Sequence, residues 1–343
     1  MSPNRRQILL ALGGSVLSHG VWAQPAGETP AYPANKPIRI VVPYPVGGGA
    51  DALARSVGKR LSEELKTSVV VENKPGANGF IGAREVGSAM PDGHSMVVVT
   101  DGLYSIAPYL LPAGTKDPLQ DLVPVIQLVD NPLVIVARPG LGVDNIAQLI
   151  ELAKRKPDEL TFAANNTTST HYLATQVLMK QAGIRMQHIV YAGAGQSIPD
   201  LIGGRFDLLV GSPTAVDPAV KSGRGVKYIA VTSKERFPTL PEVQSVSETL
   251  PGYDQPAAMG LMATKGTPPP VIALLNRTIQ KILDEPEIRK TMVEIVGGIP
   301  VGGTPEFFRD LMAKQKAARG PLLQELGLLQ PQIEAGSGPS GSR

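Results

Sequence analysis

Two short segments of the chain combine residue types that can bind an anion through the backbone alone. Residues 41–51 read "VVPYPVGGGAD", and residues 188–200 read "HIVYAGAGQSIPD". Each has a β-branched run, a tyrosine, a turn of glycine and small residues, and an aspartate where a helical pattern begins. Glycine lets a backbone approach a ligand closely, and the first N–H groups of a helix lack partners within the helix. We therefore predict that these two turns bind one carboxylate or phosphate from opposite sides of a cleft.

The expected ligand-binding residues of the first turn are Tyr44, Val46, Gly47, Gly48 and Asp51. Those of the second turn are Tyr191, Gly193, Ala194 and Gly195. An aspartate at this place more often caps a helix than meets a ligand. If Asp51 does reach the ligand, it favours one that also carries an ammonium group.

A third segment, "TDGLYS", follows an apolar run and supplies two hydroxyl groups. Ligands of parallel sheets lie beyond the carboxyl ends of the strands, so Thr100 and Ser105 are expected donors. Capping of the turn explains the same two residues equally well.

The elements that must position these turns alternate along the chain. Apolar, β-branched runs such as "IRIVVP" and "SMVVVT" alternate with helical periods such as residues 53–65, which indicates parallel sheets covered by helices. Two sets of strands predict an α/β protein of two lobes, joined by the crossing strands "VIVARPG" and "GLMATKG". We assign residues 36–137 with 259–330 to lobe 1 and residues 138–258 to lobe 2. Residues 24–35 are expected to form a flexible leader, and residues 331–343 a disordered tail.

The first 23 residues match the pattern of an export signal. They have a basic start at Arg5 and Arg6, an apolar run over residues 8–17, and small residues before Gln24. The apolar run is too short and too broken by glycine to span a membrane. We expect cleavage after export by the twin-arginine or the general secretory route, which places the mature chain in the periplasm.

Composition excludes several classes of function. The chain has no cysteine, which excludes thiol chemistry and disulfides, and its net charge of +3 is no footprint for nucleic acid. It has no G-x-S-x-G motif, no P-loop and no pair of histidines at zinc-binding spacing. We therefore expect no enzyme, no metal and no cofactor.

Several ordered blocks of the sequence closely resemble one known family. The blocks include "PYPVGGGADALAR", "VVVENKPGANGFIGAREV" and "IVYAGAGQSIPDLIGGRFDLLVGSP". They resemble the Bug-type receptors of tripartite tricarboxylate transporters over roughly residues 37–329. The resemblance implies a periplasmic binding protein of the type II fold, whose two lobes, each a sheet flanked by helices, close on a small carboxylate. It also implies that the loops 44–49 and 191–195 hold the near carboxylate, partly through water.

The resemblance extends the expected binding set to a loop in lobe 2. The family usually has a serine- and glycine-rich loop there, whereas this chain has "AANNTTSTHYL". The expected contacts are Asn166, Thr167, Ser169 and Thr170, and Asp207 completes the set.

The expected partners are a small organic carboxylate and the membrane subunits of such a transporter, with the receptor as a monomer. The acid could be a C4-dicarboxylate, a tricarboxylate, an amino acid or an aromatic acid. A periplasmic sensor that signals to a membrane kinase and, with less support, a secreted hydrolase are the alternatives.

Overall fold

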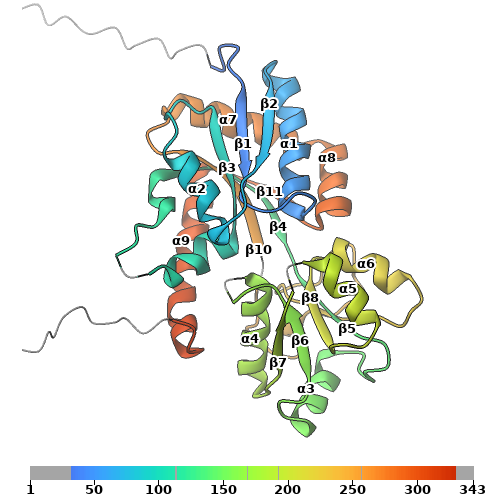
Figure 1. The fold of residues 1–343 in the computed structure, drawn as a ribbon. Helices are drawn as coiled ribbons and strands as arrows, with labels where there is room; N and C mark the ends of the chain where they lie inside the picture. Colours follow the sequence, from blue (N-terminus) through green and yellow to red (C-terminus); the bar gives the residue numbers. More distant parts are fainter. Residues whose placement is uncertain (1–31, 113, 168, 192, 256, 330–343) are drawn as a thin grey trace, which may run out of the picture.

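The computed structural model describes residues 32–329, apart from 113, 168, 192 and 256, and it contains two sheets in two lobes (Figure 1). The expected export signal at 1–23, most of the expected leader and the expected tail at 331–343 lie outside the described residues. In the described part, no helix combines the length and apolar character that a membrane crossing requires.

The sheet of the first lobe has six strands. Their order is β11 (Ile299–Gly302), β4 (Leu122–Asn131), β10 (Ala257–Thr264), β3 (Ser95–Thr100), β1 (Ile38–Val42) and β2 (Val69–Asn73). β1 runs parallel to both β2 and β3, whereas β10 runs antiparallel to β3 and β4. The sheet is covered on both faces, because Ile40 of β1 packs with α1 (Gly49–Leu65) and Val41 packs with α2 (Phe80–Gly87). This double burial explains the continuous apolar run of β1.

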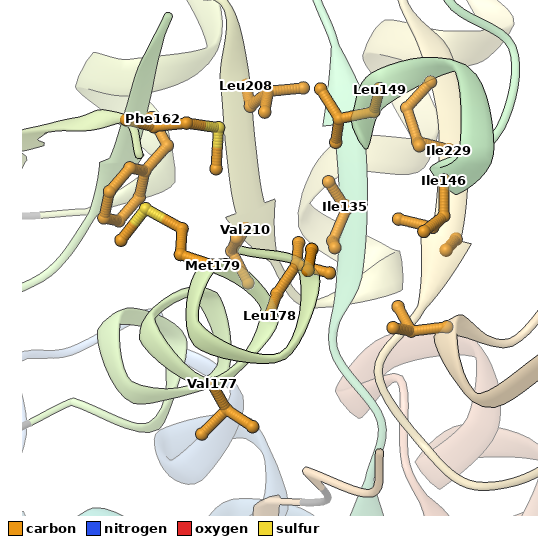
Figure 2. Packing of buried hydrophobic residues seen from close by; sticks show 14 of the residues in the cluster. Ile135, Ile146, Leu149, Phe162, Val177, Leu178, Met179, Leu208, Val210 and Ile229 are labelled. Atoms are coloured by element: carbon orange, nitrogen blue, oxygen red, sulfur yellow. The ribbon is translucent and has the colours of Figure 1, made fainter. Parts of the chain in front are cut away.

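The sheet of the second lobe has five strands. Their order is β7 (Gln187–Val190), β6 (Thr161–Ala164), β8 (Leu208–Gly211), β5 (Val134–Ala137) and β9 (Lys227–Val231). Its helices are α3 (Ile146–Arg155), α4 (Thr170–Ala182), α5 (Ala194–Ile202) and α6 (Pro213–Lys221). Figure 2 shows the core on one face, where Ile135 and Val210 of the sheet lie beside Leu178 of α4, with Ile146 of α3 nearby.

The lobe boundaries differ from those expected at two places. β5, "VIVA", hydrogen-bonds to β8 and β9, so the first crossing lies at residues 132–133 and not after Ala137. The segment "GLMATKG" lies largely in β10, inside the first sheet, so the return crossing precedes it. The sequence alone suggests that both runs cross between the lobes, because an apolar run does not reveal which sheet it joins.

The first lobe also begins earlier than expected. The Tyr32 hydroxyl donates to the Gly93 carbonyl at 2.9 Å, and its ring contacts His94, so the last leader residues pack on the lobe.

The remaining helices belong mainly to the first lobe. They are α7 (Pro269–Asp284), α8 (Pro286–Thr291) and the long α9 (Pro305–Glu325). α9 touches both lobes, because Phe308 lies in a core cluster of the first lobe and Leu323 in the core cluster of the second. Figure 1 shows α9 running along one side of the molecule, and its last turn carries Glu325, which pairs with Lys180 of α4. α9 therefore connects the lobes in addition to the two crossings.

Candidate functional site

The carboxyl ends of the parallel strands in the two lobes face each other. Asn166, after β6, donates through its side-chain amide to Asn78, after β2, at 3.0 Å. The Thr170 hydroxyl at the start of α4 donates to Asp101, directly after β3, at 3.2 Å. These contacts bring together the regions in which we predicted ligand binding.

The first predicted turn is tied to both neighbouring strands. The hydroxyls of Tyr44 and Thr100 share a hydrogen bond of 2.6 Å, and the Asn73 amide donates to the Tyr44 carbonyl at 3.1 Å. Burial raises the pKa of Tyr44 to about 12, so its hydroxyl is neutral at neutral pH. β1, β2 and β3 thereby fix the beginning of the turn.

The buried side chain of Asp51 stabilises the shape of this turn. Its buried carboxylate accepts hydrogen bonds from the Gly47 amide, the Asn73 amide and Arg55, each at 3.0 Å. Burial alone would raise the pKa of this carboxyl group, but the three donors outweigh burial and hold it below its usual value. Asp51 and the Gly47 N–H are therefore used within the chain, where they support the turn instead of serving as free ligand-binding groups.

The next amides of the same turn have no partner. Gly48, Gly49 and Ala50 donate from their backbone N–H groups to no atom in the described part of the chain. Gly48 is the N-cap of α1 and has φ −81°, and the neighbouring Val46 side chain is 71% exposed. A Cβ atom added at Gly48 would meet only the Pro45 carbonyl oxygen, at 3.9 Å. The start of α1 therefore offers consecutive free donors at the end of β1 that faces the second lobe.

The second predicted turn leads from β7 into α5. Gly193 is the N-cap and has an extended backbone, with φ 173° and ψ 175°. An added Cβ atom at Gly193 or Gly195 would meet no atom within 4 Å, so the backbone here is open to an approaching group. Ala194 begins the helix. The Tyr191 hydroxyl donates to Asp200 at 2.8 Å, which ties the turn to its own helix.

Two of the predicted hydroxyl donors serve a buried carboxylate instead. The Ser105 hydroxyl is fully buried and donates to the Asp101 side chain at 2.5 Å. Thr170 donates to the other carboxylate oxygen of Asp101, which also accepts from Arg319 of α9 at 3.2 Å. Ser105 and Thr170 thus belong to a buried network at the junction of the lobes and are not free donors.

The predicted loop of lobe 2 is held by its own helix cap. The Ser169 hydroxyl accepts from the Tyr172 amide at 3.2 Å and donates to the Asn166 carbonyl at 2.7 Å. Asn166 and Thr167 are exposed. Ser169 is therefore a helix cap that shapes this loop.

Asp207 lies at the wrong end of the sheet to join this site. It precedes β8, and a residue before a parallel strand lies at the edge opposite the carboxyl ends. Its carboxylate accepts from Arg138 at 2.8 Å and from the Thr161 amide at 2.8 Å. Asp207 therefore lies apart from the other predicted residues, and it braces the amino ends of β6 and β8.

Two surface cavities lie away from the predicted residues. One of about 370 Å³ lies at the amino ends of β1 and β3 and is lined by residues that include Arg39 and His94. The other, of about 300 Å³, is lined by residues that include Lys234 and Tyr253. Neither lining contains a residue of the predicted set. Among the described residues, no group of three or more histidine or acidic side chains could hold a metal ion.

Three polar residues at the junction were absent from the sequence prediction. Asn73 is the last residue of β2 and Asp101 follows directly after β3, so the rule that selected Thr100 could have selected them too. Asn78 stands in the short "GANG" stretch between two glycines, a signal for an unusual turn.

The geometry can be compared with known proteins. The family model TctC, described as the tripartite tricarboxylate transporter family receptor, matches residues 53–328. BugT of Bordetella pertussis is 32% identical over 331 residues, which cover 94% of this chain and 98% of BugT.

Two solved structures are also similar. The structure of R. palustris Rpa4515 with adipate has a TM-score of 0.78 and 28% identity, covering 86% of this chain and 98% of that chain. MatC from Rhodopseudomonas palustris with bound malate has a TM-score of 0.73 and 26% identity, covering 83% of this chain and 98% of that chain. The expected two-lobed α/β fold and the resemblance to Bug-type receptors are thereby confirmed. This chain belongs to the family of solute-binding receptors of tripartite tricarboxylate transporters.

Proposed function

We propose that this receptor is exported to the periplasm, binds a small organic carboxylate between its lobes as a monomer, and delivers it to the membrane subunits of its transporter. Two similar receptors support a carboxylate ligand, since their structures contain adipate and malate. The basic start at Arg5 and Arg6 and the apolar run behind it support export.

The observation that carries this proposal is the row of free amides at Gly48, Gly49 and Ala50. Each N–H bond to a charged acceptor contributes about 1.5–3 kcal/mol, and a helix terminus adds roughly 0.3–1 kcal/mol. The turn at Gly193–Gly195 supplies the opposing side. Backbone donors thus bind the carboxylate without a neutralising cation. This is consistent with the small net charge of the chain.

A binding screen with variants at both turns tests the proposal. Thermal shift identifies acids that stabilise the receptor, because bound ligand raises stability by mass action. Titration calorimetry then compares wild type with Gly48→Asp and Gly195→Asp, which place a competing carboxylate at each turn. Both variants should fold normally, since both sites have room for a Cβ atom, and both should lose at least about 100-fold in affinity.

The matched controls are Gly48→Ala and Gly195→Ala, which add the Cβ atom without the charge. We expect them to retain most of the affinity. Wild-type affinity in both aspartate variants would show that the ligand binds elsewhere.

A further inference from the structure

The loop between β2 and α2 has an unusual backbone. Four successive residues, Gly76, Ala77, Asn78 and Gly79, have positive φ, at 132°, 45°, 56° and 97°. Alanine rarely adopts this conformation, although asparagine tolerates it, and strain such as that at Ala77 persists only where the surroundings impose it. Neighbouring side chains restrain the loop at Gly76 and Gly79. A Cβ atom at Gly76 would lie 2.5 Å from Ile81, and one at Gly79 would lie 3.2 Å from Leu103.

This constrained loop projects one side chain toward the second lobe. The Asn78 side-chain oxygen accepts the hydrogen bond from the Asn166 amide. Asn166 is itself held, because its carbonyl accepts from both the amide and the hydroxyl of Ser169. Two fixed loops, one from each lobe, therefore meet through a pair of carboxamides.

The carboxamide pair lies beside the two glycine turns. β2 is the neighbour of β1, and β6 is the neighbour of β7, so the pair is displaced by one strand from the turns in each sheet. Neighbouring strands are about 4.8 Å apart. A Cβ atom added at Gly79 would also lie 3.5 Å from Pro43, which directly precedes the first turn. This spacing suits a ligand with a second polar group a few bonds from its first carboxylate.

The orientation of the pair leaves a donor for that second group. Because Asn78 accepts with its oxygen, its NH₂ group is the remaining donor, and this group has no acceptor in the described part of the chain. A neutral NH₂ group favours an acceptor such as a carboxylate and provides no compensation for an ammonium group.

We propose that Asn78 is a specificity-determining residue that recognises the distal carboxylate of a dicarboxylic acid, with Asn166 holding its amide in place across the lobes. This inference rests on the proposed function, because the glycine turns must hold the first carboxylate. It adds the residue that recognises the second carboxylate, and it predicts that this residue favours a diacid over a monoacid of equal chain length.

The test measures the affinities of matched acid pairs by titration calorimetry. The probes are succinate with butyrate, and adipate with hexanoate. Wild type should bind at least one diacid more tightly than its monoacid. Asn78→Gly removes the amide in a residue that adopts positive φ freely, so the loop should keep its shape. We expect it to weaken diacid binding by about 10- to 100-fold and monoacid binding by less than about 3-fold.

Asn35→Gly is the matched control, since Asn35 is also an exposed asparagine with φ 57° but lies before β1, at the far end of the sheet. It should leave both affinities unchanged. Asn78→Asp should weaken diacid binding further than Asn78→Gly, because the new carboxylate repels the distal one.

Equal losses for diacid and monoacid in Asn78→Gly, or no loss at all, would overturn the inference and leave the proposed function intact. Equal wild-type affinity for both members of each pair would overturn it as well. Failure of the proposed function looks different, because the wild type would then bind no acid in the whole thermal-shift screen, or Gly48→Asp and Gly195→Asp would both keep wild-type affinity.

Discussion

The Asp51 carboxylate has a structural role that its position in the first turn of a helix does not reveal. It accepts hydrogen bonds from the Gly47 amide, from Asn73 at the end of β2 and from Arg55 in α1, so one buried group fixes the shape of the turn that presents the free amides. The donors that stabilise its charge also hold the Gly47 amide away from any ligand. The free amides therefore begin at Gly48.

Replacing Asp51 should affect both stability and binding. Asp51→Ala leaves the Gly47 and Asn73 donors without their acceptor, so we expect a loss of about 1–3 kcal/mol in the free energy of unfolding and at least 10-fold in affinity. Urea denaturation and calorimetry measure the two effects. Asp144→Ala, which breaks an exposed pair with Lys227, is the control and should change stability by less than about 0.5 kcal/mol.

Among the elements, α9 is the one whose contacts are least explained by the sequence around it. Its Arg319 is 6% exposed and lies between the contacts with the two lobes, where it donates to Asp101 at 3.2 Å and to Gln255 at 2.5 Å. Gly320 follows directly, and a Cβ atom there would lie 2.9 Å from the Tyr109 ring, so the helix packs closely at this point.

Removing the Arg319 guanidinium while keeping Asp101 should lower the free energy of unfolding substantially. Arg319→Met leaves the Asp101 carboxylate buried without its charged partner, so we expect the free energy of unfolding to fall by about 3–5 kcal/mol. The double variant Asp101→Asn with Arg319→Met removes the uncompensated charge and should recover part of that loss. Urea denaturation of wild type and both variants provides the comparison. A double variant no more stable than Arg319→Met would contradict the role of the ion pair.

The elements show what the sequence could and could not predict. β1, β3, α1 and α4 form where local apolar patterns place them, because period and turn chemistry are local properties. Arg319 and Asp101 are 218 residues apart, and nothing local indicates their contact. The position of Asp207 apart from the glycine turns could not be predicted for a related reason, since it depends on which end of β8 faces the other lobe. The glycine turns were found because each carries its signal within a few residues.

At the scale of the whole molecule, we expect His171 to make the free energy of unfolding depend on pH. Burial lowers its pKa to about 4, whereas an unfolded chain protonates histidine near pH 6.5. Between these values the unfolded state binds more protons than the folded state. We therefore expect the contribution of His171 to the free energy of unfolding to fall as the pH falls from about 7 toward 4.

His171→Gln should remove this part of the pH dependence. We expect wild type to lose about 1–2 kcal/mol of stability between pH 7 and pH 5, and the variant to lose clearly less. Urea denaturation at the two pH values measures both. Parallel losses in the two proteins would mean that other groups cause the acid sensitivity.

The attachment of α9 to both lobes has a consequence for affinity. If only the two crossing segments joined the lobes, the lobes could adopt many relative orientations. Binding a ligand between them would then restrict the lobes to a few of these orientations, at a cost in entropy. The third attachment, made by α9 through Leu323 and the Glu325–Lys180 pair, reduces the number of relative orientations of the lobes before any ligand binds. Preorganisation of this kind lowers the entropic cost of capture, so a larger share of each hydrogen bond to the ligand appears as binding strength.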